Sequence, residues 1–378
     1  MSAGRLIAMA RKEFIQIRRD PRSLLIALLL PIMQMALLGY GISLDAKHLA
    51  LYVYDQEGSQ DSQALLKHFQ ASQYFDLIRT VNNYHDLKRA IDSEQCKLGV
   101  VIPFDFSKRI RDSGSASVQV IVDGTDDNTA NLAIGYSQAV IADYSAGVQH
   151  DWLTTQGLPV AGGGGLSIEP RTWFNEDLES RNFIVPGIMA LVMALVGALL
   201  TSLTIAREWE RGTMEQLIST PVTSREVMLG KLIPYFVLGM IDAALCAAIG
   251  VWWFEVPFRG TVWMLALTTA LFLAVVLAIG FVISAGLKNQ LAASSIALMV
   301  TLLPTSLLSG YAFPIEQMPA PIRAITYLIY SRYYVTILKA LFLKGVGARA
   351  LLGEMTALAV YAVIAGFFAT RAFRKTLV

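Results

Sequence analysis

Residues 183–205 read FIVPGIMALVMALVGALLTSLTI, a run of 23 residues without a charged side chain. A helix needs about 20 apolar residues to cross the hydrocarbon core of a bilayer. The stretch is therefore predicted to be a membrane-spanning helix. The next residues, AREWERGT at 206–213, are rich in charge, so we expect the helix to leave the membrane there.

Five further stretches meet the same criterion, at 24–44, 232–253, 261–287, 290–312 and 350–370. The chain of 378 residues is 54% hydrophobic and only 16% charged, whereas soluble domains carry roughly a quarter charged residues. We expect an α-helical polytopic membrane protein with six transmembrane helices, an N-terminal interfacial helix and an inserted α/β extracytoplasmic domain.

Hydropathy divides the chain into four parts: an amphipathic helix at 1–22, a first span at 23–44, the extracytoplasmic α/β domain at 45–182, and spans two to six at 183–378. The last part includes a charged loop at 206–231. It also includes residues 313–345, which mix prolines, aromatics and sparse charges. We read that segment as one or two short helices at the outer face that partly re-enter the membrane, where protein shields their backbone.

Residues 3–19 have the spacing of an interfacial helix. One helical face is predicted to carry the apolar residues Leu6, Ala10, Phe14 and Ile17. The other face carries most of the basic residues, which are Arg11, Lys12, Arg18 and Arg19. Asp20 and Pro21 should end this helix and begin the first span, because Asp caps a helix and Pro suits its first turn.

Lysine and arginine near the span ends predict the orientation. They gather before span one (5–22), in the loop 206–231, at Lys288 and in the tail from Arg371. With six spans, all four regions fall on one side, which we assign to the cytoplasm together with both termini. The basic residues between Arg323 and Arg349 do not fit this assignment. We give more weight to the basic residues of the first helix and of the long loop at 206–231.

The part between the first two spans alternates between strand and helix patterns. Strands are expected at 49–55, 74–81, from 97 and at 116–124, helices at 62–72, 84–96 and from 125 to about 153, and a flexible linker at the GGGG of 162–165. Asp123, Asp126 and Asp127 could bind calcium, but a capped helix start is the favoured reading, because the spacing matches no calcium loop.

Several classes of site are not expected. Cys96 and Cys246 lie in different environments, so no disulfide is predicted, and the four histidines lack metal-ligand spacing. The net charge of +2 and the absence of a basic stripe argue against nucleic acid. No G-x-x-x-x-G-K-[ST] motif occurs, so an ATPase partner or an ion gradient must supply energy.

The loop AREWERGTMEQLISTPVTSREVMLGK at 206–231 carries the strongest functional signal. We expect Glu208 to reach Arg211 at i,i+3, Gly212 to allow a bend, and MEQLI to form a short helix that ends before Pro221. Thr223 and Ser224 can cap the next helix. The segment is either a solvated hairpin or a rigid docking helix for a cytoplasmic partner.

The pattern E-x-E-R-G-T-M-E-Q-L-x-x-T-P-V-T at 208–223 resembles the coupling region of the type-2 ATP-binding-cassette (ABC) exporter permeases. RKEF-x-Q-x-x-RDPR at 11–22 looks like the elbow helix of that family, and L-x-S-G-Y-x-F-P-I-E-x-M-P at 307–319 is similar to its end of span five. The large insertion after span one resembles its bacterial drug-exporter branch.

The resemblance implies a multi-pass permease of the bacterial inner membrane. Two such chains, identical or paralogous, would dock a cytoplasmic ATPase dimer that binds ATP and Mg, while this chain itself binds no cofactor. Lipid surrounds the spans, and a periplasmic adaptor is a further implied partner. The positions carried over as ATPase-coupling residues are Glu208, Arg211, Gly212, Thr213 and Glu215.

The resemblance also places spans two and five along the transport path at the dimer axis. The candidate path residues are Met189, Met193 and Val196 in span two, with Met299, Thr301, Leu303 and Pro304 in span five. Flexible methionines tolerate varied hydrophobic ligands, which suits an amphipathic or drug-like substrate. Ordinary helix packing explains the same residues equally well.

Two other functions remain open. Asp242 lies inside span three and could serve an ion-coupled carrier, although a helix–helix hydrogen bond is the favoured role. The chain could also be a membrane-anchored receptor or structural protein that binds through residues 45–182. The scarcity of charges inside the spans favours the ATP-driven exporter.

Overall fold

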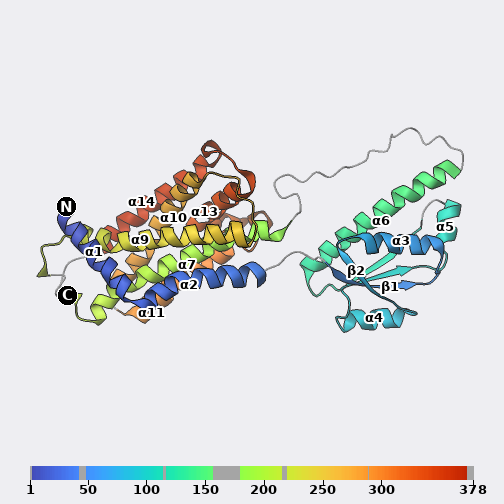
Figure 1. Ribbon diagram of the computed structural model, residues 1–378, viewed down its shortest axis with the longest axis horizontal. Coiled ribbons are helices and arrows are strands. Elements are labelled where there is room, and N and C mark those ends of the chain that lie inside the picture. Colours follow the sequence, from blue (N-terminus) through green and yellow to red (C-terminus); the bar gives the residue numbers. More distant parts are fainter. Residues whose placement is uncertain are drawn as a thin grey trace. The chain divides into compact units, whose positions relative to one another are not determined.

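The computed structural model describes residues 2–41, 48–113, 116–155, 179–214, 219–287 and 289–372. The chain forms two compact units (Figure 1). The helical unit comprises Met1–Ile42 and Thr172–Val378, and the sheet unit comprises Ser43–Arg171.

The helical unit consists of long helices connected by turns and short helices. Its α-helices are α1 (Ala3–Arg19), α2 (Pro21–Gly41), α7 (Ser180–Glu210), α9 (Ser224–Ala248), α10 (Val262–Gly286), α11 (Gln290–Leu308), α12 (Ala320–Thr326), α13 (Tyr330–Lys339) and α14 (Leu352–Ala372). Its short helical turns are η1 (Ile249–Trp253), η2 (Ile315–Gln317), η3 (Ala340–Lys344) and η4 (Ala348–Leu351).

Within the described ranges, five helices are long and apolar enough to cross a membrane. They are α7, α9 continued by η1, α10, α11, and α14 preceded by η4. Among the described side chains of α2, the uninterrupted apolar helix is Ala27–Gly41. These lengths and this composition are those of a polytopic membrane protein.

Helix α7 is the centre of the helical unit and packs against α2, α9, α10, α11 and α13 (Figure 1). Most of its side chains are buried. Its contact with α10 is close at Gly280, where an added Cβ would lie 2.9 Å from the carbonyl oxygen of Ala198 and would collide with the Thr201 hydroxyl. Small residues at such crossings allow helix backbones to approach.

The junction between α1 and α2 follows the sequence prediction, because α1 ends at Arg19 and α2 begins at Pro21. Helix α1 buries one charged residue that the sequence prediction did not place on its apolar face. Phe14 is 55% exposed, whereas Glu13 is 2% exposed and lies on the buried face between Met9 and Ile17. The physical reason is that Glu13 finds an ionic partner inside the protein, a contact that hydrophobicity alone does not indicate.

Residues 313–345 form η2, α12, α13 and η3, which are more short helical segments than the one or two expected from the sequence. Helix α13 packs against α7 and α14, and the buried Tyr334 ring stacks on Phe272 of α10 with centroids 4.1 Å apart. The hydroxyl groups of Tyr334 and Thr269 share a hydrogen bond of 2.8 Å. The buried tyrosine thus has its polar atom satisfied.

The sheet unit alternates strands and helices. Its elements are β1 (Leu49–Asp55), α3 (Gln60–Ala71), β2 (Phe75–Thr80), α4 (Tyr84–Asp92), β3 (Leu98–Ile102), α5 (Phe106–Ser113), β4 (Gln119–Val122) and α6 (Asp127–Thr155). The strand order is β2-β1-β3-β4, with β1 parallel to β2 and β3, and β4 antiparallel to β3.

Both faces of the sheet are covered by helices, α3 and α6 on one side and α4 on the other (Figure 1). Leu51 and Val53 of β1 pack with α3, whereas Tyr52 packs with Leu87 of α4. This alternation is the period of two expected for a strand. The sequence analysis assigned no helix between the strand from 97 and the strand at 116–124, but α5 begins there at Phe106. The GGGG of 162–165 lies outside the described residues.

Asp123 lies just after β4 and is held by hydrogen bonds. Lys97 Nζ donates to its Oδ2 at 2.7 Å, and Thr125 donates to Oδ1 through its backbone amide and its hydroxyl. The Lys97 bond, followed by those from Thr125, holds the pKa of the Asp123 carboxyl well below its usual range.

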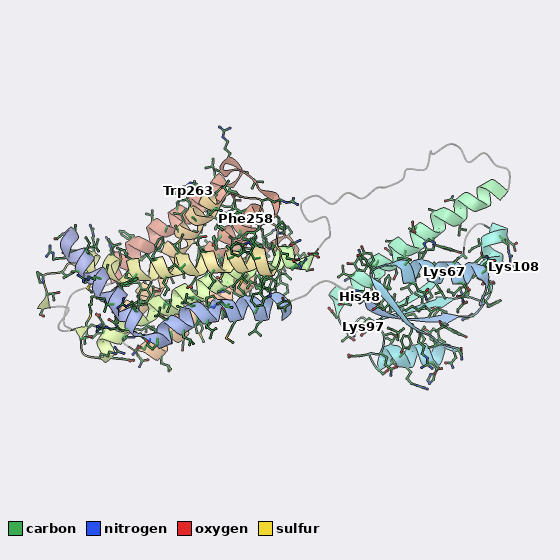
Figure 2. The ribbon with its side chains drawn as sticks, in the orientation of Figure 1. His48, Lys67, Lys97, Lys108, Phe258 and Trp263 are labelled. Atoms are coloured by element: carbon green, nitrogen blue, oxygen red, sulfur yellow. The ribbon has the colours of Figure 1, made fainter. Side chains whose placement is uncertain are left out.

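Lys97 lies on the sheet unit together with Lys67 and Lys108 (Figure 2).

The crossing of α7 and α10 gives a test of the helical packing. Gly280→Ala is expected to lower the free energy of unfolding by about 1–3 kcal/mol, because the added methyl group overpacks a close backbone contact. Gly286→Ala on the same helix has nothing within 4 Å of its added Cβ and should be neutral or stabilising. Thermal unfolding of the purified chain in detergent measures both, and equal unfolding temperatures would contradict the packing described.

Candidate coupling site

The last turn of α7 contacts several neighbouring helices through separate charged side chains. Arg207 Nη1 lies 3.3 Å from Oδ2 of Asp20, at the junction of α1 and α2. Glu210 Oε1 accepts a hydrogen bond of 2.7 Å from the backbone amide of Gln290, the first residue of α11. Glu208 points to α1 and α9. A displacement of this turn would therefore act on four neighbouring helices.

Four side chains, Lys12, Glu13, Glu208 and Lys231, form what we call the Lys231 cluster. Lys231 Nζ of α9 donates to Glu13 Oε1 at 2.8 Å and to Glu208 Oε1 at 2.9 Å. Lys12 Nζ reaches the same Glu208 oxygen at 3.1 Å from its half-exposed position. The Lys231, Glu13 and Glu208 residues are only 1%, 2% and 5% exposed.

Burial gives the Lys231 cluster its importance. Two ammonium groups face two carboxylates, so the cluster as a whole is neutral. Removing one partner of a buried ion pair leaves an uncompensated charge and costs about 3–5 kcal/mol. The cluster therefore holds α1, the end of α7 and the start of α9 in one fixed arrangement.

A second polar link connects α1 to the start of α9. Thr223 caps α9 as predicted, and it forms a reciprocal capping box with Glu226. The Glu226 carboxylate also accepts a hydrogen bond of 2.6 Å from the backbone amide of Ser2 and lies 3.6 Å from the Arg5 guanidinium. Both ends of the charged loop are thus connected to α1.

The turn after α7 needs a glycine. Gly212 has a φ of 68°, a left-handed conformation that other residues rarely adopt. Thr213 next to it is exposed, while Met214 is 1% exposed and packs in a hydrophobic cluster with Met9, Ile205 and Phe281. Met214 thus anchors the turn to the bundle.

The sequence-predicted coupling residues fall in different surroundings. The expected pair of Glu208 with Arg211 is wrong, because Glu208 turns inward to the two lysines. Arg211, Gly212 and Thr213 are exposed. Glu215 and most of the MEQLI stretch lie outside the described residues.

Two residues of the site, Glu13 and Lys231, were not predicted from the sequence. Glu13 belongs to the RKEF stretch and stands between Met9 and Ile17 on one helical face. Lys231 stands four residues after the buried Val227. Each of these residues is a charged residue on the apolar face of a helix, and this pattern was the signal available in the sequence. Lys231 was instead assigned to the charged loop at 206–231.

The candidate path residues are distributed over two helices that pack side by side. Met189, Met193 and Val196 of α7 are at most 2% exposed within the chain. On α11, Thr301 is buried, Pro304 is half-buried, and Met299 and Leu303 are 64% and 53% exposed. Within the described residues, the candidate path residues of α7 therefore face the interior of their own chain, whereas Met299 and Leu303 of α11 face outward.

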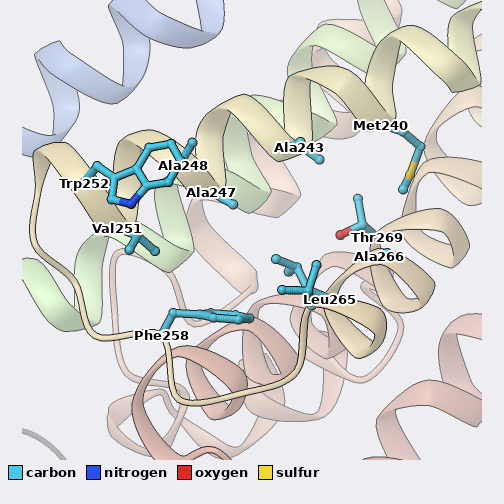
Figure 3. Close-up of a pocket in the computed structure, with 12 residues that line it drawn as sticks. Met240, Ala243, Ala247, Ala248, Val251, Trp252, Phe258, Leu265, Ala266 and Thr269 are labelled. Carbon is cyan, nitrogen blue, oxygen red and sulfur yellow. The ribbon is translucent and has the colours of Figure 1, made fainter.

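An apolar pocket of about 370 Å³ lies elsewhere, between α9 with η1 and α10 (Figure 3). Its wall includes Ala243 and Ala247 of α9 and Leu265 of α10, with Trp252 and Phe258 at one end. Thr269 adds a single hydroxyl group. Such a lining suits an apolar molecule, and the pocket includes none of the candidate path residues.

The surroundings of Asp242 contradict the helix–helix hydrogen bond that was favoured for it. The side chain is fully buried in α9, and neither carboxylate oxygen has a hydrogen-bond partner within the described ranges. The expected helix–helix hydrogen bond is therefore absent there. No group of three or more His, Cys, Asp or Glu side chains among the described residues has an arrangement that could hold a metal ion.

Comparisons with known proteins fit this architecture. Residues 22–371 match the family described as ABC-2 family transporter protein. The chain is 39% identical over 352 residues to the probable multidrug ABC transporter permease YbhS of Escherichia coli, which covers 91% of this chain and 90% of that protein. It is 28% identical over 371 residues to the probable multidrug ABC transporter permease YbhR of the same organism, 98% of each chain.

A third relative, the inner membrane transport permease YhhJ of Escherichia coli, is 25% identical over 300 residues, 77% of this chain and 76% of that protein. The family match spans nearly all of the sequence, including every candidate membrane helix. This multi-pass membrane protein therefore belongs to the ABC-2 transporter family, as the permease of an ATP-driven exporter whose ATPase activity resides in a partner subunit.

Proposed function

We propose that the chain crosses the inner membrane six times, with α2 as the first span, and that both termini face the cytoplasm. Support comes from one end of the helical unit, where α1, the ends of α7, α10 and α14, and the start of α9 share a hydrophobic cluster. The basic segments singled out in the sequence flank those ends. The sheet unit then lies on the extracytoplasmic side, where a periplasmic adaptor is its proposed partner.

The 206–231 segment is proposed to be the contact with the ATPase dimer. Its described exposed residues include Arg211, Gly212 and Thr213, and Glu215 belongs to the same contact. ATP and Mg bind to the partner subunits. The single observation that carries this proposal is the buried Lys231 between Glu13 and Glu208, because it makes the start of α9 follow the end of α7.

Two permease chains, identical or paralogous, are proposed to meet along α11. Leu291, Met299, Leu303 and Leu307 are between 49% and 79% exposed on that helix, and a second copy would cover them. Because α7 packs directly on α11, a push transmitted through α7 would reach this contact. Met189, Met193, Val196, Thr301 and Pro304 stay proposed as path residues that become accessible when these helices separate.

The proposed substrate is an amphipathic or drug-like molecule. Two relatives are named as probable multidrug permeases. The apolar pocket beside Trp252 and Phe258 supports this choice, because a mostly hydrophobic wall with one hydroxyl group accepts varied apolar groups.

Substitution of Gly212 tests the coupling turn. Gly212→Val forces a β-branched residue into the left-handed region, where non-glycine residues lose about 1–2 kcal/mol, so the turn should change shape. The complex with its ATPase subunits, reconstituted in vesicles, is expected to hydrolyse ATP while exporting several-fold less substrate per ATP. Gly212→Asn should stay within about twofold of wild type, because Asn tolerates this conformation. Equal export by all three proteins would contradict the proposal.

Substitution of Lys231 tests the buried connection. Lys231→Met leaves Glu13 and Glu208 without their buried cation and should cost about 3–5 kcal/mol of stability. Lys12→Met removes a half-exposed lysine from the same cluster and should cost about 0–1 kcal/mol. Thermal unfolding and ATP-driven export are measured on both variants.

A triple variant separates loss of stability from loss of coupling. Glu13→Leu, Glu208→Leu and Lys231→Met together replace the buried charges by apolar groups and should recover most of the stability. Similar unfolding temperatures for Lys231→Met and Lys12→Met would show that the Lys231 cluster is not the connection inferred here.

A further inference from the structure

A second pocket, of about 470 Å³, lies beside the coupling site and is lined mainly by charged and polar residues. Its wall is formed by Lys12, Ile15, Gln16 and Arg19 of α1, by Asp20, and by Arg207 and Arg211 of α7. Four cationic side chains thus surround the pocket with one carboxylate. The excess of positive charge makes it a candidate anion site.

Two of the four cations already have partners. Arg207 pairs with Asp20 at 3.3 Å, and Lys12 pairs with Glu208 at 3.1 Å. Arg19 and Arg211 are exposed and form no ion pair with another residue in the part of the chain that the structure describes. A guanidinium presents donors in a planar fork that matches two oxygens of a phosphate, so these two arginines suit a phosphate group.

The position of the pocket points to a lipid as the source of that phosphate. Span α2 begins at Pro21, directly after Asp20, and the apolar part of α7 ends directly before Arg207. Both junctions mark the level at which a helix passes from hydrocarbon into headgroups. Figure 1 shows α1 lying across this end of the bundle, where α2 begins.

An acyl chain also has a surface to follow. Helix α2, which starts at the pocket, exposes Leu25, Leu29, Met33 and Leu37 at successive turns. Helix α1 exposes Ile7 and Phe14, the arrangement of a helix that rests on a membrane. A soluble anion would use the arginines but neither apolar surface.

We infer that the pocket between α1 and the end of α7 binds the phosphate headgroup of an anionic phospholipid, through Arg19 and Arg211. The lipid fills the space between the interfacial helix and the last turn of α7. It supports that turn from the membrane side. Basic pockets between membrane helices on the cytoplasmic side are known to take such headgroups.

The test uses the purified full chain without its ATPase, so it is independent of the coupling proposal. Native mass spectrometry from micelles counts bound lipid during titration with dioctanoyl phosphatidylglycerol, dioctanoyl phosphatidylcholine or inorganic phosphate. Wild type should bind phosphatidylglycerol about tenfold more tightly than phosphatidylcholine, and equimolar inorganic phosphate should not displace the lipid.

Arg19→Gln with Arg211→Gln should lower the affinity for phosphatidylglycerol about tenfold, to that for phosphatidylcholine. The matched control is Arg11→Gln with Arg18→Gln, which removes the same charge from exposed positions of α1 outside the pocket and should change affinity by less than about twofold. Arg19→Lys with Arg211→Lys keeps the charge without the fork and should give an intermediate affinity.

Three results would overturn the inference. Equal weakening by the control pair would indicate diffuse attraction to basic residues, and displacement by equimolar phosphate would indicate a free-anion site. Unchanged lipid binding in the Arg19 and Arg211 variant would exclude the pocket. If that variant, co-expressed separately with the ATPase subunits, also failed to co-purify with them, the pocket would be a protein contact instead. Unfolding temperatures confirm that each variant is folded.

Discussion

A lysine buried between two carboxylates is the constraint on which the rest of the helical unit depends. Lys231 cannot leave Glu13 and Glu208 without exposing charge to an interior that does not solvate it. The three residues come from α9, α1 and α7, so their helices move together. The adjoining Glu226 and Arg207 contacts repeat the same link at both ends of α1.

Local signals predicted much of this fold. Apolar length located the membrane helices, Thr223 the start of α9, and Asp20 with Pro21 the break between α1 and α2. These features depend on residues a few positions apart, so a single sequence reveals them. The Lys231 to Glu13 bond joins residues 218 positions apart, and no local pattern contains it. The same limit explains Glu13, whose burial was not predicted, and Asp242, which was given a hydrogen-bond partner that it lacks within the described residues.

The charges at this end of the bundle fall into two groups with different consequences. Lys231 pairs with Glu13 and Glu208 inside the protein, and these contacts fix its geometry. Arg19 and Arg211 point to a pocket and keep their charge available to a ligand. A count of basic residues predicts orientation, but only the contacts separate structural charges from those that bind. The proposed ATPase contact and the inferred lipid site therefore share one framework.

The most direct test of the account is a cross-link from the exposed turn that follows α7. Thr213→Cys offers an accessible thiol, while the native Cys96 and Cys246 are buried. A short bifunctional thiol-to-amine reagent is applied to inside-out membrane vesicles that contain the complete exporter. The account predicts a cross-link between residue 213 and the ATPase subunit. Labelling of this thiol by an impermeant reagent only from the extracytoplasmic side, with no cross-linked product, would contradict it.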